Sequence, residues 1–312
     1  MQIFPIVTIL IPVYNGSNYM REAIDSALAQ TYKNIEVIVV NDGSNDGGKT
    51  REIALSYGNK IRYFEKENGG VSTALNLAIK EMKGEFFSWL SHDDVYYPDK
   101  ILEQLKFYLS LDNPKTIIFS DEDIIDAEGK IIQKRSLKLI NERNDNFHLL
   151  LYSHIGGCSL LIPKRAFEES GPFNESLKTT QDYDMWFRML KNGYKFEYLP
   201  VCSNKSRIHP LQVSAIKVRL AIKEQNNLFA WALDNFAPEF LSWKETDIFY
   251  NYVEIFNNLY QRPWLIKTAY KAMTKAYSKK SNAFVPIVQL LYYSDLILRY
   301  FLSHFYKSKT NL

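Results

Sequence analysis

Residues 7–16 read VTILIPVYNG, and this stretch decides the fold class. Its first five residues are rich in apolar and β-branched side chains, as in a strand that is buried in a sheet. Pro12 ends the strand pattern, and the YNG that follows is typical of a turn. Apolar residues then recur at intervals of three and four from Met20 to Leu28, which indicates one face of a helix. The fold therefore begins with a strand, a turn and a helix.

The same alternation continues along the chain. Further strands are expected at residues 36–40, 61–64, 86–90, 116–120, 159–162 and 194–199. Further helices are expected at residues 50–57, 71–82, 98–109 and 181–190. We expect Gly84 to cap one of these helices and Leu109 to lie on the inner face of another. This alternation predicts an α/β fold in which a mainly parallel, Rossmann-like sheet is flanked by helices.

Composition excludes several classes of protein. The chain has 312 residues and a net charge of +3, so no global basic field indicates a nucleic-acid partner. The two cysteines, Cys158 and Cys202, lie far apart without zinc-ligand spacing, which argues against a disulfide scaffold or a structural zinc site. The N-terminus has no basic region followed by a long apolar run, so we expect a cytoplasmic protein without a signal peptide.

Polar loops follow four of the expected strands, and they contain the candidate functional residues. In chain order they are Pro12-Val13-Tyr14-Asn15-Gly16, Asn41-Asp42-Gly43-Ser44, Glu67-Asn68-Gly69-Gly70 and Ser91-His92-Asp93-Asp94. The carboxyl ends of parallel strands lie at one edge of a sheet, and ligands bind outside that edge. We therefore expect the four loops to meet in one binding site.

The chain lacks two common phosphate-binding loops. Neither GxGxxG after the first strand nor GxxxxGK[ST] is present. Asp93 and Asp94 could instead hold Mg²⁺ or Mn²⁺, which bridge to phosphate, although an Asp pair also caps helices or forms turns. Tyr14 could stack on a nucleobase or pack on the sheet, and Asp42 could bind a base or ribose or form an Asx-turn.

The order of these motifs resembles the family 2 glycosyltransferases, which have the GT-A fold. The resemblance covers residues 5–214. It implies contacts to a nucleotide-sugar donor by the following residues: Pro12, Val13, Tyr14, Asn15, Asp42, Asn68, Gly70, Asn76, His92, Asp93 and Arg207. It also implies a divalent metal, Mn²⁺ or Mg²⁺, held by Asp93 and His209. Ser91 stands where the family's DxD motif has its first aspartate, which puts the strength of metal binding in question.

The same resemblance implies how a reaction would run. Asp182 matches the general base of the family's Glu-Asp-x-Asp pattern, although a first-turn aspartate also suits a helix dipole. Gln181 replaces the usual Glu, and Gly157, Cys158 and Gln181 are implied beside the acceptor. The implied function is inverting transfer from a nucleoside-diphosphate sugar, with UDP as the nucleotide, to a saccharide or lipid-linked acceptor. A sugar-nucleotide nucleotidyltransferase and an inactive nucleotide-sugar-binding subunit are the alternatives.

The last third of the chain has a different pattern. From residue 214 the sequence is helical without strand signals, which predicts a catalytic domain at 1–213 and a helical region at 214–312. Residues 283–306 are rich in Leu, Ile, Tyr and Phe and are flanked by lysines. Such a helix could pack on the catalytic domain, form a homo-oligomer or make a peripheral contact with a membrane surface.

Overall fold

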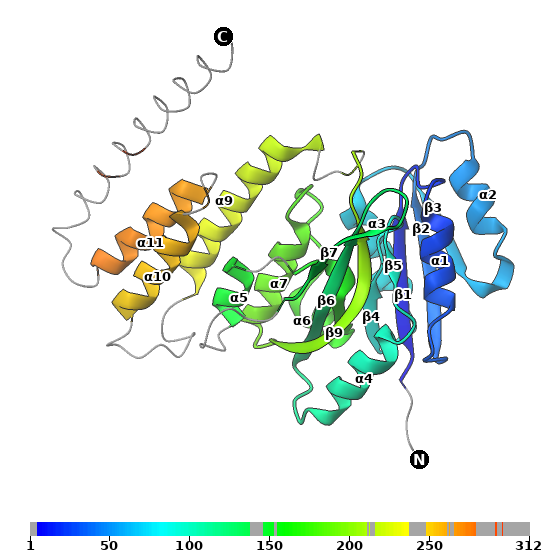
Figure 1. Cartoon of the computed structure of the whole chain (residues 1–312), viewed down its shortest axis with the longest axis horizontal. Helices are drawn as coiled ribbons and strands as arrows, with labels where there is room; N and C mark the ends of the chain where they lie inside the picture. The colour runs from blue at the N-terminus through cyan, green and yellow to red at the C-terminus, as the bar shows by residue number, and fades with distance from the viewer. Residues whose placement is uncertain are drawn as a thin grey trace, which may run out of the picture. The chain divides into compact units, whose positions relative to one another are not determined.

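A computed structural model describes residues 5–137, 146–152, 155–210, 212, 216–236, 248–260, 262, 265–278, 291 and 295 (Figure 1). The strands are β1 (Val7–Val13), β2 (Ile35–Asp42), β3 (Arg62–Lys66), β4 (Phe86–Trp89), β5 (Val95–Tyr96), β6 (Thr116–Ile125), β7 (Ile131–Arg135), β8 (Leu160–Pro163) and β9 (Lys195–Arg207). The helices are α1 (Met20–Leu28), α2 (Lys49–Leu55), α3 (Val71–Glu81), α4 (Lys100–Ser110), α5 (Asn146–Tyr152), α6 (Arg165–Ser170), α7 (Gln181–Lys191), α9 (Val218–Asn235), α10 (Ile248–Tyr260) and α11 (Ile266–Ser278).

The strands form one sheet in the order β3-β2-β1-β4-β8-β6-β9-β5, with β7 paired to β6. β3, β2, β1 and β4 run parallel to one another, whereas β8 runs antiparallel to both β4 and β6. The expected α/β fold with a sheet flanked by helices is confirmed, and β3, β2, β1 and β4 are its expected parallel part. The antiparallel strands β5, β7 and β8 make the complete sheet a mixed one.

The order of the parallel strands creates a topological switch point between β1 and β4. The chain steps outward from β1 to β2 and β3, and then crosses back to place β4 on the other side of β1. Right-handed crossovers therefore put α1 and α2 on one face of the sheet and α3 on the other. Because ligands bind outside the carboxyl ends of strands at such a point, the loops after β1 and β4 flank the expected site.

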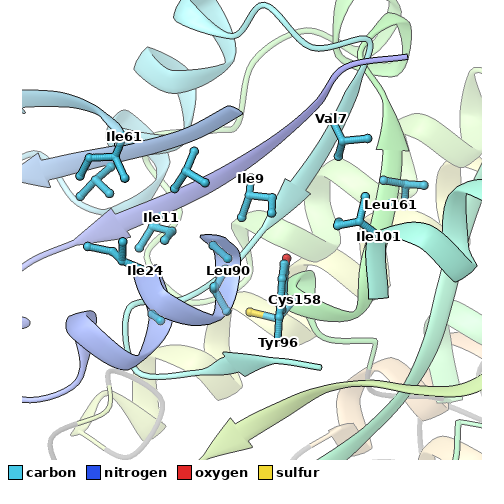
Figure 2. Packing of buried hydrophobic residues seen from close by; sticks show 14 of the residues in the cluster. Val7, Ile9, Ile11, Ile24, Ile61, Leu90, Tyr96, Ile101, Cys158 and Leu161 are labelled. Atoms are coloured by element: carbon cyan, nitrogen blue, oxygen red, sulfur yellow. The ribbon is translucent and has the colours of Figure 1, made fainter. Parts of the chain in front are cut away.

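Alternate side chains of β1 build the core under this edge. Val7, Ile9 and Ile11 are fully buried on one face, where they pack with Ile24 of α1 and Ile101 of α4 (Figure 2). Residues two apart in a strand share a face, and the three- and four-residue spacing of α1 presents one apolar stripe to it. Each such buried side chain contributes about 2 kcal/mol. This packing fixes the position of β1 and of the loop that follows it.

Pro12 does not end the first strand, contrary to our expectation. β1 continues through Pro12 to Val13, in parallel register with β2. Leu10 O accepts a hydrogen bond from Leu90 N at 2.9 Å, on the β4 side of β1. Backbone groups two residues apart point the same way, so the missing N–H of Pro12 also faces that side. Because β4 ends at Trp89, the proline removes no ladder hydrogen bond.

Gly84 does not cap α3, which corrects a second expectation. α3 ends at Glu81, and its C-cap residue Met82 has an extended backbone. A Cβ on Gly84 would lie 2.5 Å from Thr8 Oγ1. Glycine is therefore needed here because the backbone passes close to β1, not because the helix ends.

The inner face of α4 is polar at its centre. Leu109, which we expected to face inward, is 60% exposed. The buried Lys100 lies on the inner face instead. Its Nζ donates hydrogen bonds to three acceptors: Ser88 Oγ at 3.0 Å, Gln104 Oε1 at 2.7 Å and Leu160 O at 3.0 Å. Burial lowers the pKa of Lys100 to about 7.

The chain divides into two compact units, Met1–Ala221 and Ile222–Leu312. Within the second unit, α10 and α11 bury apolar side chains, and Asp234 of α9 forms ion pairs with Lys271 and Lys275 of α11. The expected helical character after residue 214 is therefore present in the part that the structure describes.

Two predictions for this region concern residues that the structure does not describe. The predicted boundary at residue 213 is one of them, and the predicted helix at 283–306 is the other, apart from residues 291 and 295. Among the described helices, none combines the length and the apolar character that are needed to cross a bilayer.

Replacing Lys100 with Met should change how stability depends on pH. A lysine in the unfolded chain has a pKa of about 10.4, so it stays protonated between pH 7 and 9. In the folded protein Lys100 has a pKa of about 7 and loses its proton over the same range. The free energy of unfolding of the wild type therefore gains up to about 2 kcal/mol from this group as the pH rises from ~7 to ~9. Urea unfolding at both pH values should show that Lys100→Met loses this gain.

Lys106→Met is the matched control, because Lys106 lies on the same helix but is largely exposed and forms a surface ion pair with Glu103. It should keep the wild-type pH dependence. Equal pH dependence of the wild type and Lys100→Met would contradict the lowered pKa of Lys100.

Candidate active site at the carboxyl edge of the sheet

The carboxylate of Asp42 joins the loop after β2 to the loop after β3. Its Oδ1 accepts a hydrogen bond from Gly69 N at 3.1 Å, and its Oδ2 accepts one from Gly70 N at 2.7 Å. Asn68 Nδ2 donates to Asp42 O at 2.8 Å and to Oδ2 at 3.3 Å. A Cβ on Gly43 would lie 2.5 Å from Asn68 N, and the φ of +68° at Gly43 favours glycine. Asp42 thus positions two of the predicted donor contacts, Asn68 and Gly70.

A cation and a hydroxyl complete the surroundings of Asp42. Lys66 Nζ lies 2.7 Å from Asp42 Oδ1 and also donates to Thr73 Oγ1 at 2.8 Å and to the carbonyl of Glu67. Thr73 Oγ1 itself lies 3.3 Å from Asp42 Oδ1. Our sequence reasoning missed Lys66 and Thr73. The signal is the strand register, because Asp42 and Lys66 are direct partners in the parallel pair of β2 and β3.

The loop after β1 is fastened to the loop after β2. Asn15 Nδ2 donates to Asn45 Oδ1 at 2.8 Å, and Asn45 N donates to Asn15 Oδ1 at 2.8 Å. Asn15 N also donates to Ser44 Oγ at 2.8 Å. Tyr14, which precedes these anchors, is 44% exposed at the edge of the sheet. Its ring is therefore accessible, whereas the predicted contacts Pro12 and Val13 are buried in β1.

Gly16 brings the loop after β1 against the loop after β4. A Cβ on Gly16 would lie 2.6 Å from His92 Cδ2 and would also collide with Val13. Gly16 N donates to Thr50 Oγ1 at 3.0 Å, so the glycine is held from the other side as well. Burial lowers the pKa of His92; the charge of Asp93 opposes this effect and the nearby His209 adds to it, and the net direction is downward. A neutral His92 ring therefore packs between these loops.

Asp93 and His209 converge from the loop after β4 and the end of β9. Asp93 Oδ2 lies 3.0 Å from His209 Nε2. A carboxylate oxygen and an imidazole nitrogen are ligands that Mn²⁺ accepts, and Mg²⁺ also takes carboxylate oxygens. Within the described residues, no group of three or more His, Cys, Asp and Glu side chains is arranged to hold a metal. The pair fits a metal whose other ligands come from phosphate oxygens and water.

Arg207 holds the acidic loop from inside the protein. It is 1% exposed, its backbone N donates to Asp94 Oδ1 at 2.8 Å, and its Nε donates to Asp93 O at 2.9 Å. Nη1 donates to Ala127 O at 2.9 Å, and Nη2 donates to Glu22 Oε2 at 2.7 Å. These contacts give Arg207 a positioning role in the structure. Its contact with a donor stays a prediction.

Asp94 is buried beside Cys158, behind Asp93. Asp94 Oδ2 lies 3.2 Å from Cys158 Sγ, which also accepts a hydrogen bond from Ser91 N at 3.2 Å. Burial, and then the charge of Asp93, raise the pKa of Asp94 well above its usual value. Burial also raises the pKa of the Cys158 thiol, which therefore packs as a protonated side chain.

Packing against the sheet leaves no room for a side chain at Gly157. A Cβ on Gly157 would collide with the indole ring of Trp89 on β4. Trp89 packs in turn against Phe173, with the ring centres 6.3 Å apart. The resemblance implies that Gly157 lies beside the acceptor, and the structure adds this packing requirement. The acceptor contacts of Gly157 and Cys158 stay predictions.

Asp182 lies in the first turn of α7. The next residue ties this turn to the segment before Gly157, because Ile155 N donates to Tyr183 OH at 2.8 Å. Gln181 is buried, and its Oε1 accepts no hydrogen bond within the part of the chain that the structure describes. The roles of Asp182 as base and Gln181 as acceptor contact stay predictions.

The segment before α7 reaches back to the loop after β3. Lys178 Nζ donates to Gly69 O at 3.3 Å. The amide of Asn76 on α3 exchanges two hydrogen bonds with the backbone of Phe173, at 3.0 and 2.8 Å. Asn76, a predicted donor contact, thus positions this segment in the structure. The proposed base is therefore linked to the loop that Asp42 holds.

Together, these contacts bring the loops after β1, β2, β3 and β4 to one edge of the sheet, as we expected. The edge presents an exposed aromatic ring at Tyr14, and a carboxylate and imidazole at Asp93 and His209. Such an arrangement can bind an aromatic base through stacking and a phosphate group through a bridging divalent cation.

Comparisons with known proteins agree with this geometry. The family model described as "Glycosyl transferase family 2" matches residues 8–171, which is more than half of the chain. An "uncharacterized glycosyltransferase" of Rickettsia felis is 60% identical over 190 residues, covering 60% of this chain and 32% of that protein. A second one, from Rickettsia prowazekii, is 49% identical over 239 residues, covering 75% of this chain and 74% of that protein. A hyaluronan synthase of Pasteurella multocida is 32% identical over 205 residues, covering 64% of this chain and 20% of that protein.

Solved structures share the fold. Staphylococcus aureus TarS 1–349 in complex with UDP-GlcNAc aligns with a TM-score of 0.64 at 17% identity, covering 92% of this chain and 89% of that one. The mannosyltransferase PcManGT from Pyrobaculum calidifontis, in complex with GDP-Man and Mn²⁺, aligns with a TM-score of 0.58 at 18% identity, covering 95% and 81%.

The match spans only about a third of the length of the first curated relatives. The family assignment does not depend on the remainder of those proteins, because the family model matches residues 8–171 and the Rickettsia prowazekii relative covers 75% of this chain. The motifs, the GT-A-like fold and these matches agree, and the chain belongs to glycosyltransferase family 2.

Proposed function

We propose that this chain transfers a sugar from a nucleoside-diphosphate donor, with UDP as the nucleotide, to a saccharide or lipid-linked acceptor. One observation carries the proposal. The loop with Tyr14, the loop that Asp42 holds and the Asp93–His209 pair all lie at the edge of the sheet where its switch point is. The complexes of TarS with UDP-GlcNAc and of PcManGT with GDP-Man support a nucleotide-sugar donor. The hyaluronan synthase relative supports a saccharide acceptor.

The donor half of the site divides into three parts in this proposal. Tyr14 stacks on the base, and the loop that Asp42 positions, with Asn68 and Gly70, surrounds the nucleoside. Asp93 and His209 would hold Mn²⁺ or Mg²⁺ beside the diphosphate. Such a cation, when bound, would offset the negative charge that develops on the leaving diphosphate.

The acceptor half supplies the base. The oxygen of an acceptor hydroxyl attacks the anomeric carbon while the bond from that carbon to the diphosphate breaks, which inverts the configuration. Asp182 takes the proton of the hydroxyl, and the nucleoside diphosphate leaves with the bonding electron pair. Residues 1–213 carry this chemistry in the proposal, and residues 214–312 serve packing, oligomerisation or peripheral membrane contact.

Nucleotide binding with and without metal tests the proposal directly. Thermal-shift measurements should show stabilisation by UDP that increases when Mn²⁺ is added, because the metal bridges the protein and the diphosphate. Asp93→Ala should weaken the Mn²⁺-linked part of UDP affinity at least about tenfold, since it removes a ligand. Asp112→Ala is the control, because Asp112 is an exposed carboxylate after α4, and it should behave as wild type. Indifference to every nucleotide, with and without metal, would contradict the proposed donor site.

Asp182→Asn separates binding from chemistry. The amide keeps the size of the side chain but cannot take a proton, so turnover should fall by about 100- to 10,000-fold while UDP affinity stays within about twofold. Asp184→Asn is the matched control in the same helical turn, where Asp184 binds Arg188 at 2.8 Å. Transfer assays on both variants provide the measurement. Near-normal turnover in Asp182→Asn would show that another group is the base.

Lys66→Met tests the cluster around Asp42. The change removes the charge-assisted hydrogen bond at 2.7 Å and the link to Thr73, so the loop with Asn68 and Gly70 loses its fixed position. The Kd for UDP, measured by titration calorimetry, should rise by about tenfold, while kcat at saturating donor changes little. Lys80→Met, an exposed change on α3, is the control. An unchanged Kd would mean that Lys66 has no part in positioning this loop.

A further inference from the structure

Tyr14 is exposed, yet the backbone that carries it is tightly held. Tyr14 is 44% exposed at the end of β1, so its surroundings leave much of the residue accessible. The position of the ring then depends on the backbone of the residues that follow. Asn15 has a φ of +51°, in the left-handed region that most residues avoid. Asparagine adopts this region more readily than most residues, and hydrogen bonds to its side chain can fix it there.

A reciprocal pair of hydrogen bonds with Asn45 does so. Asn15 Nδ2 donates to Asn45 Oδ1, and Asn45 N donates to Asn15 Oδ1, both at 2.8 Å. The hydroxyl of Tyr14 lies 3.5 Å from the same Asn45 Oδ1. Asn45 Oδ1, on the loop after β2, therefore lies close both to the hydroxyl of Tyr14 and to the side-chain amide of Asn15.

The other anchors of this loop hold a different part of it. Ser44 and Thr50 accept hydrogen bonds from the backbone N–H groups of Asn15 and Gly16. They fix the path of the chain but do not contact the side chain of Asn15. The Asn45 side chain is exposed at the surface and buries no core, so removing it should not unfold the protein.

We propose that Asn45 is a positioning residue for the nucleobase platform: it orients Tyr14 through Asn15 and so sets the affinity for the donor nucleotide. This inference rests on the proposed function, because it requires that Tyr14 stacks on the base. Asn45 does not itself touch the donor in this proposal. Its effect passes through the ring.

Asn45→Ala removes the acceptor of the Asn15 amide and should raise the donor KM and the Kd for UDP by about fivefold, with kcat unchanged. Asn45→Asp keeps a carboxyl oxygen at the position of Oδ1 and should restore the wild-type values within about twofold. Asn59→Ala, an exposed asparagine elsewhere on the same unit, is the matched control and should have no effect.

A double-mutant cycle then tests the route of the effect. Tyr14→Ala should weaken UDP binding by about tenfold, because base stacking is lost. Asn45→Ala should cost almost nothing further in that background, because no ring remains to be positioned. Titration calorimetry with UDP and Mn²⁺ on the wild type, both single variants and the double variant gives the four affinities.

The outcomes separate the two proposals. If Tyr14→Ala weakens UDP binding but Asn45→Ala does not, the inference about Asn45 is wrong and the proposed function stands. The same conclusion follows if Asn45→Ala costs fivefold in both backgrounds, if it lowers kcat, or if Asn45→Asp fails to restore affinity. If Tyr14→Ala leaves UDP binding unchanged, the proposed base contact is wrong and the inference about Asn45 falls with it.

Discussion

The buried guanidinium of Arg207 is the constraint on which the shape of the site depends. It binds the carbonyl of Asp93 and that of Ala127, and it reaches the carboxylate of Glu22 on α1. The loop after β4, the turn after β6 and the start of α1 are thus joined by one side chain at the end of β9. A buried donor without a partner costs about 1–3 kcal/mol, so these acceptors and Arg207 require each other. The backbone of Asp93 is therefore fixed before any metal or phosphate arrives.

The remaining loops are held by their neighbours in the sheet. Asp42 holds the loop after β3, Asn45 and Ser44 hold the loop after β1, and Gly16 lets that loop touch the loop after β4. Each contact joins loops of adjacent strands, so the strand order 3-2-1-4 becomes a continuous set of contacts along the carboxyl edge. A site that is ordered in advance loses less conformational entropy when it binds a ligand. Fold and donor binding are connected through this edge.

The sequence predicted what depends on local pattern, and failed where distant residues decide. The apolar repeat of α1 and the polar loops after four strands are visible along the chain, and both are where we expected them. The interior lysine at Lys100 and the role of Lys66 were not visible, because they depend on strand register and on acceptors up to 60 residues away. The prediction that Pro12 ends the first strand was wrong for the same reason, because a proline is tolerated inside β1 only where β4 ends. The burial of Arg207 was also not visible, because its position in the sequence does not reveal it, and its contact with a donor stays a prediction.

The two halves of the proposed site differ in how they are attached. The donor half is built from loops that are direct neighbours, whereas Asp182 sits on a helix whose preceding segment reaches the sheet edge through Lys178 and Gly69. Gly69 is one of the residues whose backbone N–H groups Asp42 holds, so the same short loop contacts the nucleoside side and the segment of the base. A change in that loop is therefore transmitted to both halves. This coupling gives the loop after β3 more influence than its few residues would imply, because it joins the proposed donor site to the helix that carries the proposed base.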